Sequence, residues 1–208
     1  MKWQQDLTRD IRFHDQRDDY DGGSWQGFPH PQGYESGHSG EFTVENKKYI
    51  EKYFDYVKKN CRAILEIGVC RNSSHSSTHS FLKYKNPDTI YVGIDLDDKS
   101  FLNDISNNIY TIKNTSSDIT QNMAIMKSFG VTKFDFIFID GLHSVNQVLI
   151  DWEYTQWLGE GGMVGFHDVT CHPGPARFVE ALNTDKWNVE KNLCPEDWGI
   201  GFAWPRHY

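Results

Sequence analysis

Short apolar runs separated by helix-like stretches recur along most of this chain, and this alternation constrains the fold more than any other feature. Strands are predicted at 63–69, 89–96, 109–114, 134–140, 162–168, 187–194 and 199–204. Helices are predicted at 43–60, 74–85, 98–107, 118–129, 144–158 and 174–183. Strands that alternate with helices form parallel sheets with both faces covered. The expected fold class is therefore α/β.

The first part of the chain differs from the rest. Residues 1–42 show no hydrophobic period and are rich in glycine, with tryptophan and histidine scattered among them. We expect an N-terminal arm or lid over 1–42, and a single α/β domain over 43–208. Such a segment is either a partly ordered arm or a lid that faces the substrate, and the sequence leaves both interpretations open.

Charge and cysteine usage exclude several classes of protein. The chain carries 21 basic and 29 acidic residues and a net charge of −8. An acidic surface repels phosphate backbones, so a nucleic-acid partner is not expected. No stretch approaches the roughly 18 apolar residues of a membrane span, and the first residues lack the apolar core of a secretory signal. Four cysteines without paired spacing favour a reduced, cytoplasmic protein.

Polar groups end each of the first five predicted strands. The ends carry Glu66 and Gly68, then Asp95, then the segment 114–118, then Asp140, and finally His167 with Asp168. In open parallel sheets the ligand lies beyond the carboxyl ends of the strands. These groups should therefore gather at one edge of the sheet and form the binding site.

The first two of these strand ends indicate a nucleoside ligand. Gly68 allows the backbone to approach a ligand closely, and Asp95 stands where an acid binds ribose hydroxyls in nucleotide-binding folds. The segment is not G-x-G-x-x-G and lacks the lysine of a phosphate-binding loop. A pyrophosphate is therefore disfavoured, and a nucleoside without phosphates fits better.

The segments "LEIGVCRNSS" (65–74), "YVGIDL" (91–96) and "NTSSDI" (114–119) resemble motifs of the class I S-adenosylmethionine-dependent methyltransferases, and the resemblance covers about 39–204. It implies a Rossmann-like, seven-stranded sheet with the last strand antiparallel, and S-adenosyl-L-methionine as the cofactor. Asn72 replaces a family glycine, and asparagine tolerates the positive φ of such a turn. The implied cofactor-binding residues are Glu66, Gly68, Asn72, Ser74, Asp95, Ser116, Ser117 and Asp140.

The segment 138–169 resembles the metal-dependent small-molecule O-methyltransferases, including antibiotic-sugar methyltransferases and cephalosporin hydroxylase-like proteins. The resemblance implies that Asp140, His167 and Asp168 hold a divalent cation. It also implies that His143 is the general base and that Asp140 takes part in catalysis. Related enzymes generally carry an acid or amide at the position of His167. Mg²⁺ prefers oxygen ligands, whereas this set also suits Mn²⁺, Fe²⁺ or Zn²⁺, so the identity of the metal stays open.

These patterns predict methyl transfer to a hydroxyl of a small molecule such as a sugar, a polyol or a phenol, assisted by a divalent cation, Mg²⁺ or Mn²⁺ first. Two alternatives remain open. A nicotinamide-dependent oxidoreductase is disfavoured by the missing pyrophosphate glycines. A non-catalytic cofactor-binding or assembly protein is kept open by Asn72 and His167. The sequence does not determine the oligomeric state, and a homo-oligomer is compatible with it.

Overall fold

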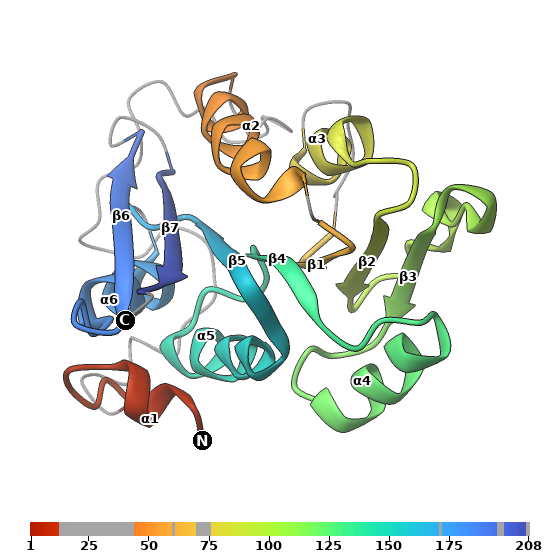
Figure 1. Cartoon of the computed structure of the whole chain (residues 1–208). Helices are drawn as coiled ribbons and strands as arrows, with labels where there is room; N and C mark the ends of the chain where they lie inside the picture. The colour runs from red at the N-terminus through yellow and green to blue at the C-terminus, as the bar shows by residue number, and fades with distance from the viewer. Residues whose placement is uncertain (13–43, 60, 70–75, 171, 195–197, 207–208) are drawn as a thin grey trace, which may run out of the picture.

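The fold was analysed in a computed structural model that describes residues 1–12, 44–59, 61–69, 76–170, 172–194 and 198–206 (Figure 1). The strands are β1 Ala63–Ile67, β2 Ile90–Asp95, β3 Ile109–Lys113, β4 Phe134–Ile139, β5 Leu158–His167, β6 Trp187–Leu193 and β7 Ile200–Pro205. They form one seven-stranded sheet in the order β3-β2-β1-β4-β5-β7-β6, and β7 runs antiparallel to both of its neighbours. The predicted fold class, with its antiparallel last strand, is confirmed.

Helices cover both faces of the sheet, so the domain has three layers (Figure 1). One face carries α2 Val44–Lys58 and α3 Ser77–Tyr84. The other carries α1 Trp3–Asp6, α4 Ile119–Ser128, α5 Val145–Trp152 and α6 Pro173–Ala181. Each face has its own buried cluster, with Phe54 and Phe81 over one and Trp152 and Phe178 over the other. Because both faces are covered, every residue of β1 and β4 is buried.

Three helices begin at side chains that cap their first turn. Ser76, Asp118 and Ser144 accept hydrogen bonds from the backbone N–H three residues further on, at the starts of α3, α4 and α5. Such caps satisfy backbone donors that have no partner inside the helix. The cap at Ser144 matters most for the site, because it fixes where the loop after β4 ends and α5 begins.

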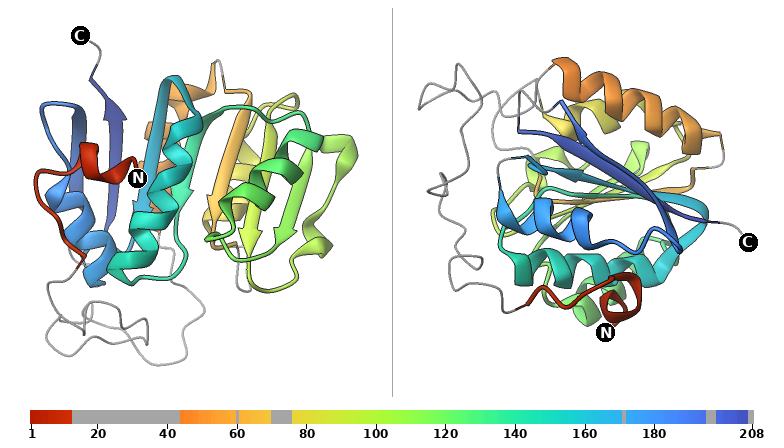
Figure 2. Two further views of the ribbon diagram at one scale, coloured as in Figure 1. Left: turned by 90° about the horizontal axis from the view of Figure 1, so that it is seen from below. Right: turned by 90° about the vertical axis from the view of Figure 1, so that its left-hand side faces the viewer.

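The first twelve residues pack onto the domain. Trp3, Leu7 and Ile11 are buried in the same core as α5 and α6, and the segment lies beside these helices (Figure 2). Asp6 accepts a hydrogen bond from the Trp152 indole at 3.0 Å. Residues 1–12 therefore belong to the domain core, although the sequence suggested an arm from residue 1. Residues 13–43 lie outside the described residues, and a lid there stays a prediction.

The prediction of one short helix over 98–107 was wrong. Two 3-10 turns form instead, η2 Ser100–Leu102 and η3 Ile105–Asn107. Asp98 and Asp104 accept hydrogen bonds from the backbone N–H groups of Ser100 and Asn107. Aspartate side chains that bind nearby backbone compete with a continuous helix.

The predicted helix over 144–158 is also divided. It consists of α5 and the 3-10 helix η4 Glu153–Trp157, and β5 then begins at Leu158, earlier than predicted. Within the described part of the chain, no helix is long and apolar enough to cross a bilayer.

Candidate active site

The neighbouring strands β4 and β5 bring three predicted site residues together. The strands are parallel, with Ile139 paired to Phe166, so Asp140 lies beside His167 and Asp168 at the carboxyl edge. The His167 Nδ1 atom lies 3.2 Å from Asp140 Oδ1 and 3.3 Å from Asp168 Oδ2. His167 is 2 % exposed, so the charges of this group act with little screening by water.

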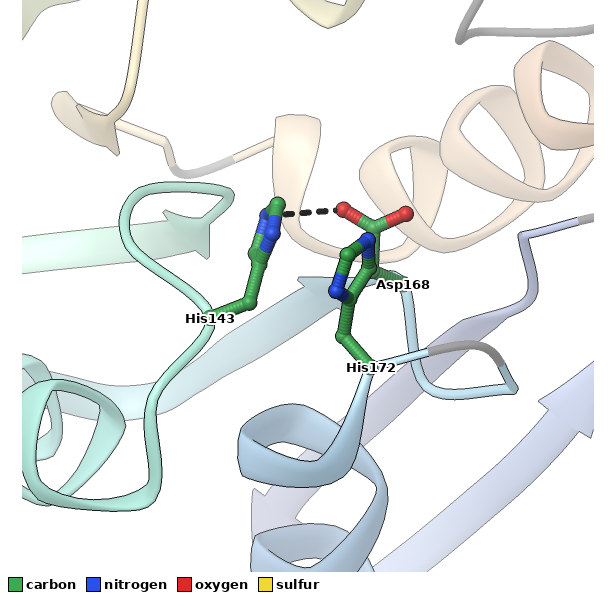
Figure 3. Close-up of side chains that lie close together, drawn as sticks. All are labelled: His143, Asp168 and His172. Carbon is green, nitrogen blue, oxygen red and sulfur yellow. Dashed lines mark ion pairs between the residues drawn. The ribbon is translucent and has the colours of Figure 1, made fainter. Parts of the chain in front are cut away.

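His143 joins the same group from the loop after β4 (Figure 3). Its Nε2 atom lies 2.8 Å from Asp168 Oδ2 and 4.0 Å from Asp140 Oδ1. The loop is tied to α6 by a hydrogen bond of 3.0 Å from the Gly174 N–H to the His143 carbonyl. A Cβ on Gly174 would lie 2.2 Å from that carbonyl oxygen, so only glycine allows this close approach.

Asp168 occupies a backbone conformation that side chains rarely adopt. Its φ is +60°, and it is buried. Non-glycine residues in this region cluster at functional sites, where the surrounding structure holds them in place. Here the His172 N–H donates to the Asp168 carbonyl at 3.1 Å. This sharp turn between β5 and α6 brings Asp168 to both His143 and His167.

The pKa values of His167 and Asp168 move in opposite directions. Burial alone would lower the pKa of His167, but the negative charges of Asp168 and Asp140 outweigh burial and hold this pKa well above its usual value. Burial alone would raise the pKa of Asp168, but the charges of His167 and His143 hold it well below its usual value. The group thus favours negative carboxylates with positive charge between them.

The donor set fits a divalent cation. Two carboxylate oxygens can face one ring nitrogen closely only if a proton or a cation supplies positive charge between them. The other nitrogen of His167, Nε2, lies 3.0 Å from the Asn46 Oδ1 atom in α2. A neutral ring that donates there from Nε2 presents the Nδ1 lone pair to a metal, which is the usual arrangement of a ligating histidine. Asp140, His167 and Asp168 each offer a ligand atom within 4.8 Å of the others.

His172 is a member of the site that the sequence did not predict. It precedes α6 and is buried, and its ring packs against the His143 ring with centroids 4.1 Å apart. The His172 ring also stacks with the Trp198 ring, with centroids 5.9 Å apart. The spacing in "HDVTCH" (167–172), with a second histidine shortly after the strand-ending pair, was the one available signal.

Gly68 joins the predicted cofactor turn to this group. Its φ is +85°, and a Cβ there would lie 1.9 Å from the Asp140 carbonyl oxygen. The Asp140 N–H donates to the Ile67 carbonyl at 2.8 Å. The ends of β1 and β4 therefore touch, and a ligand at the turn after β1 would lie next to Asp140.

Asp95 and Glu66 both hold parts of the chain near this turn. Asp95 accepts hydrogen bonds of 2.8 Å from the Val69 and Asp97 N–H groups. Glu66 is fully buried, and its carboxylate accepts from Ser77, Thr78 and Tyr91. Burial raises the pKa of Glu66 to about 7, although these hydrogen bonds oppose the shift. Glu66 thus fastens α3 to the sheet, with both carboxylate oxygens engaged.

The two predicted serines lie beside α5. Ser116 Oγ accepts from Gln147 Nε2 at 2.9 Å, and Ser117 Oγ donates to Gln147 Oε1 at 3.2 Å. Gln147 also donates to Asp151, which is fully buried and whose pKa burial raises to about 6. This network fixes the segment after β3 against α5. Asn72 and Ser74 lie outside the described residues.

Residues 65–169 match the family model of a methyltransferase domain. The match spans just over half of the chain, and the chain belongs to this family. No curated protein sequence matches it significantly.

Solved structures show which fold the domain shares. MycE methyltransferase from the mycinamycin biosynthetic pathway, in complex with Mg, SAH and mycinamycin VI, superposes with a TM-score of 0.56 at 18% identity, over 79% of this chain and 51% of that chain. This chain thus spans about half the length of MycE. CalS11, a TDP-rhamnose 3'-O-methyltransferase of calicheamicin biosynthesis, superposes with a TM-score of 0.56 at 16% identity, over 76% of this chain and 77% of that chain. Aeropyrum pernix fibrillarin, with natively bound S-adenosyl-L-methionine, superposes with a TM-score of 0.53 at 18% identity, over 72% of this chain and 68% of that chain. The fold is that of the class I S-adenosylmethionine-dependent methyltransferases.

Proposed function

We propose that this protein transfers a methyl group from S-adenosylmethionine to a hydroxyl oxygen of a small molecule, with a divalent cation at Asp140, His167 and Asp168. One observation carries the proposal. His143 and these three residues converge at the carboxyl edge of the sheet, in contact with the Gly68 turn where family members hold their cofactor.

His143 is the general base in this proposal. The acceptor oxygen attacks the methyl carbon, the carbon–sulfur bond breaks with its electrons going to sulfur, and S-adenosylhomocysteine leaves. The hydroxyl proton passes to a ring nitrogen of His143 that carries a lone pair. The His143 ring lies beside the carboxylates of Asp168 and Asp140, so an acceptor held at this group lies within its reach. A positioned base is typically worth about 10²–10⁴ in rate.

The carboxylates and His167 position the acceptor. A bound divalent cation would lower the pKa of the acceptor hydroxyl and orient its oxygen. The backbone turn at Asp168 and the contact of His167 with Asn46 hold the ligands before the acceptor arrives. Binding both reactants in line, with the cofactor beside Gly68, would supply much of the remaining acceleration.

The acceptor class is inferred from charge and from the similar proteins. A net charge of −8 disfavours polyanionic nucleic acid. MycE is bound to mycinamycin VI, and CalS11 is described as a 3'-O-methyltransferase of TDP-rhamnose. We therefore propose a sugar, polyol or phenol hydroxyl as acceptor. The four cysteines of the sequence show no paired spacing, which favours a reducing compartment such as the cytoplasm.

A methyl-transfer assay with labelled S-adenosylmethionine tests this proposal, with Mg²⁺ or Mn²⁺ and a panel of nucleotide sugars, polyols and phenols. Asp140→Ala is expected to abolish most turnover. Glu160→Ala is the matched control, because Glu160 is an exposed carboxylate on β5 before the residues that pair with β4 near the site. Equal turnover in the two variants would disprove a role for Asp140. Stabilisation by NAD but not by S-adenosylhomocysteine would favour the oxidoreductase instead.

A further inference from the structure

Among the described residues, a second group of side chains could share one ion. His143, Asp168 and His172 each offer a ligand atom within 4.8 Å of the others. They come from the loop after β4, the end of β5 and the start of α6 (Figure 3). The group shares Asp168 with the Asp140–His167–Asp168 group but brings its own two imidazoles.

The two groups differ in donor chemistry. The Asp140–His167–Asp168 group offers two carboxylates and one imidazole, a set that accepts oxygen-preferring ions. The second group offers one carboxylate and two imidazoles. Imidazole nitrogen suits Zn²⁺, Ni²⁺, Cu²⁺ and Fe²⁺, whereas Mg²⁺ prefers oxygen ligands. The second group, with two imidazoles and one carboxylate, therefore favours nitrogen-preferring ions more strongly than the first group does.

The second group is held in place by the fold. His172 is 7 % exposed, and its ring packs against the rings of both His143 and Trp198. The His172 N–H donates to the Asp168 carbonyl, and the Gly174 N–H donates to the His143 carbonyl. The backbone of all three donors is thus tied together where β5 meets α6. Ligands that are already oriented lose little conformational entropy when an ion binds.

We propose that His143, Asp168 and His172 form a second cation site, which takes a nitrogen-preferring divalent ion such as Zn²⁺. An ion bound there engages a ring nitrogen of His143 and draws Asp168 away from the first group. It therefore inhibits methyl transfer. The binding stands on the geometry alone, whereas the inhibition rests on the proposed role of His143 as the base.

Titration with Co²⁺, followed by its visible absorption, tests the binding without any acceptor. The protein with Asp140→Ala lacks a ligand of the first group and is expected to bind Co²⁺ still. Adding His172→Phe keeps an aromatic ring packed against His143 and Trp198 and removes the ligand nitrogens. Affinity should then fall more than about tenfold, since even outer-shell changes typically cost about 10–100-fold. Adding His172→Gln instead should give the same loss, and thermal unfolding of each variant checks that it is folded.

The proposal is overturned if Asp140→Ala binds no Co²⁺, or if Asp140→Ala with and without His172→Phe bind it equally well. A second arm measures Zn²⁺ inhibition of methyl transfer under excess Mg²⁺. His172→Phe should raise the inhibitory Zn²⁺ concentration more than about tenfold, and an unchanged value would disprove the inhibition. If no acceptor is methylated at all, the proposed function fails while the Co²⁺ result still decides the site.

Discussion

The carboxyl edge of the sheet has two halves, both rich in acids that end strands, and they use these acids differently. At β1 and β2, the carboxylates of Glu66 and Asp95 accept hydrogen bonds from hydroxyls and backbone N–H groups of their own chain. At β4 and β5, Asp140 and Asp168 face imidazole rings. An acid at a strand end therefore does not by itself indicate chemistry. The acids at β1 and β2 hold segments of their own chain in place, and Asp95 also lies 4.0 Å from the Lys99 Nζ atom. The acids at β4 and β5 face imidazole rings and form the candidate metal-binding group.

His143→Ala should impair the group at the ends of β4 and β5 and leave the group at the ends of β1 and β2 unchanged. We expect kcat to fall by about 10²–10⁴ with the affinity for S-adenosylhomocysteine unchanged, because only the proposed base is lost. Steady-state kinetics and calorimetry measure the two quantities. His79→Ala, a half-buried histidine on α3, is the matched control. A similar loss in both variants would mean that His143 acts only through stability.

Glu66→Gln should reveal how much the buried carboxylate at β1 lowers the free energy of unfolding as pH rises. The folded-state pKa of Glu66 is about 7, above its ordinary 4.5. The folded protein therefore binds the proton more tightly than the unfolded chain. This stabilisation is complete below about pH 4.5 and is lost as pH rises to about 7. We expect the free energy of unfolding of the wild type to fall by on the order of 3 kcal/mol over this range because of Glu66. The variant should not show this fall.

Denaturant unfolding of wild type and Glu66→Gln at pH 5 and pH 8 measures this difference. Comparing the two proteins removes the contribution of Asp151, whose pKa is also raised, to about 6. Stability curves that stay parallel across this range would show that Glu66 is not the group responsible.

Asp95→Asn should weaken binding of the cofactor without affecting the group at the ends of β4 and β5. If Asp95 binds the ribose hydroxyls, losing its charge costs about 1.5–3 kcal/mol, or roughly 10–100-fold in affinity for S-adenosylhomocysteine. The value of kcat at saturating S-adenosylmethionine should stay near wild type, since the proposed base and the proposed metal ligands are untouched. Calorimetry and saturation kinetics test this, and a fall in kcat with unchanged affinity would contradict it.

Ser117→Ala should have the smallest effect. Ser117 donates an exposed hydrogen bond of 3.2 Å to Gln147, and such surface bonds contribute about 0.5 kcal/mol or less when water can replace them. Affinity for S-adenosylhomocysteine should change less than about threefold. A larger loss would show that the Ser117 hydroxyl contacts the adenine directly, as the family resemblance implies.

The sequence predicted the site as far as strand ends can. Apolar runs identify strands, and parallel strands carry their last residues to one edge of the sheet. The sequence alone therefore predicted that Asp140, His167 and Asp168 lie close together. The role of Glu66 could not be predicted in this way. Its partners Ser77, Thr78 and Tyr91 come from α3 and β2, and hydrogen bonds between elements do not follow from periodicity.

The alternation of strands and helices, the acids and imidazoles at the strand ends, and the glycine at position 68 are properties of the sequence itself. They determined the α/β fold and the edge where chemistry is expected, because strand direction and backbone freedom are local. Only the tertiary structure decided that residues 1–12 complete the core and that His172 packs against both His143 and Trp198. It also set the left-handed turn at Asp168. Each of these depends on packing between segments distant along the chain or on backbone torsions that a local pattern does not encode.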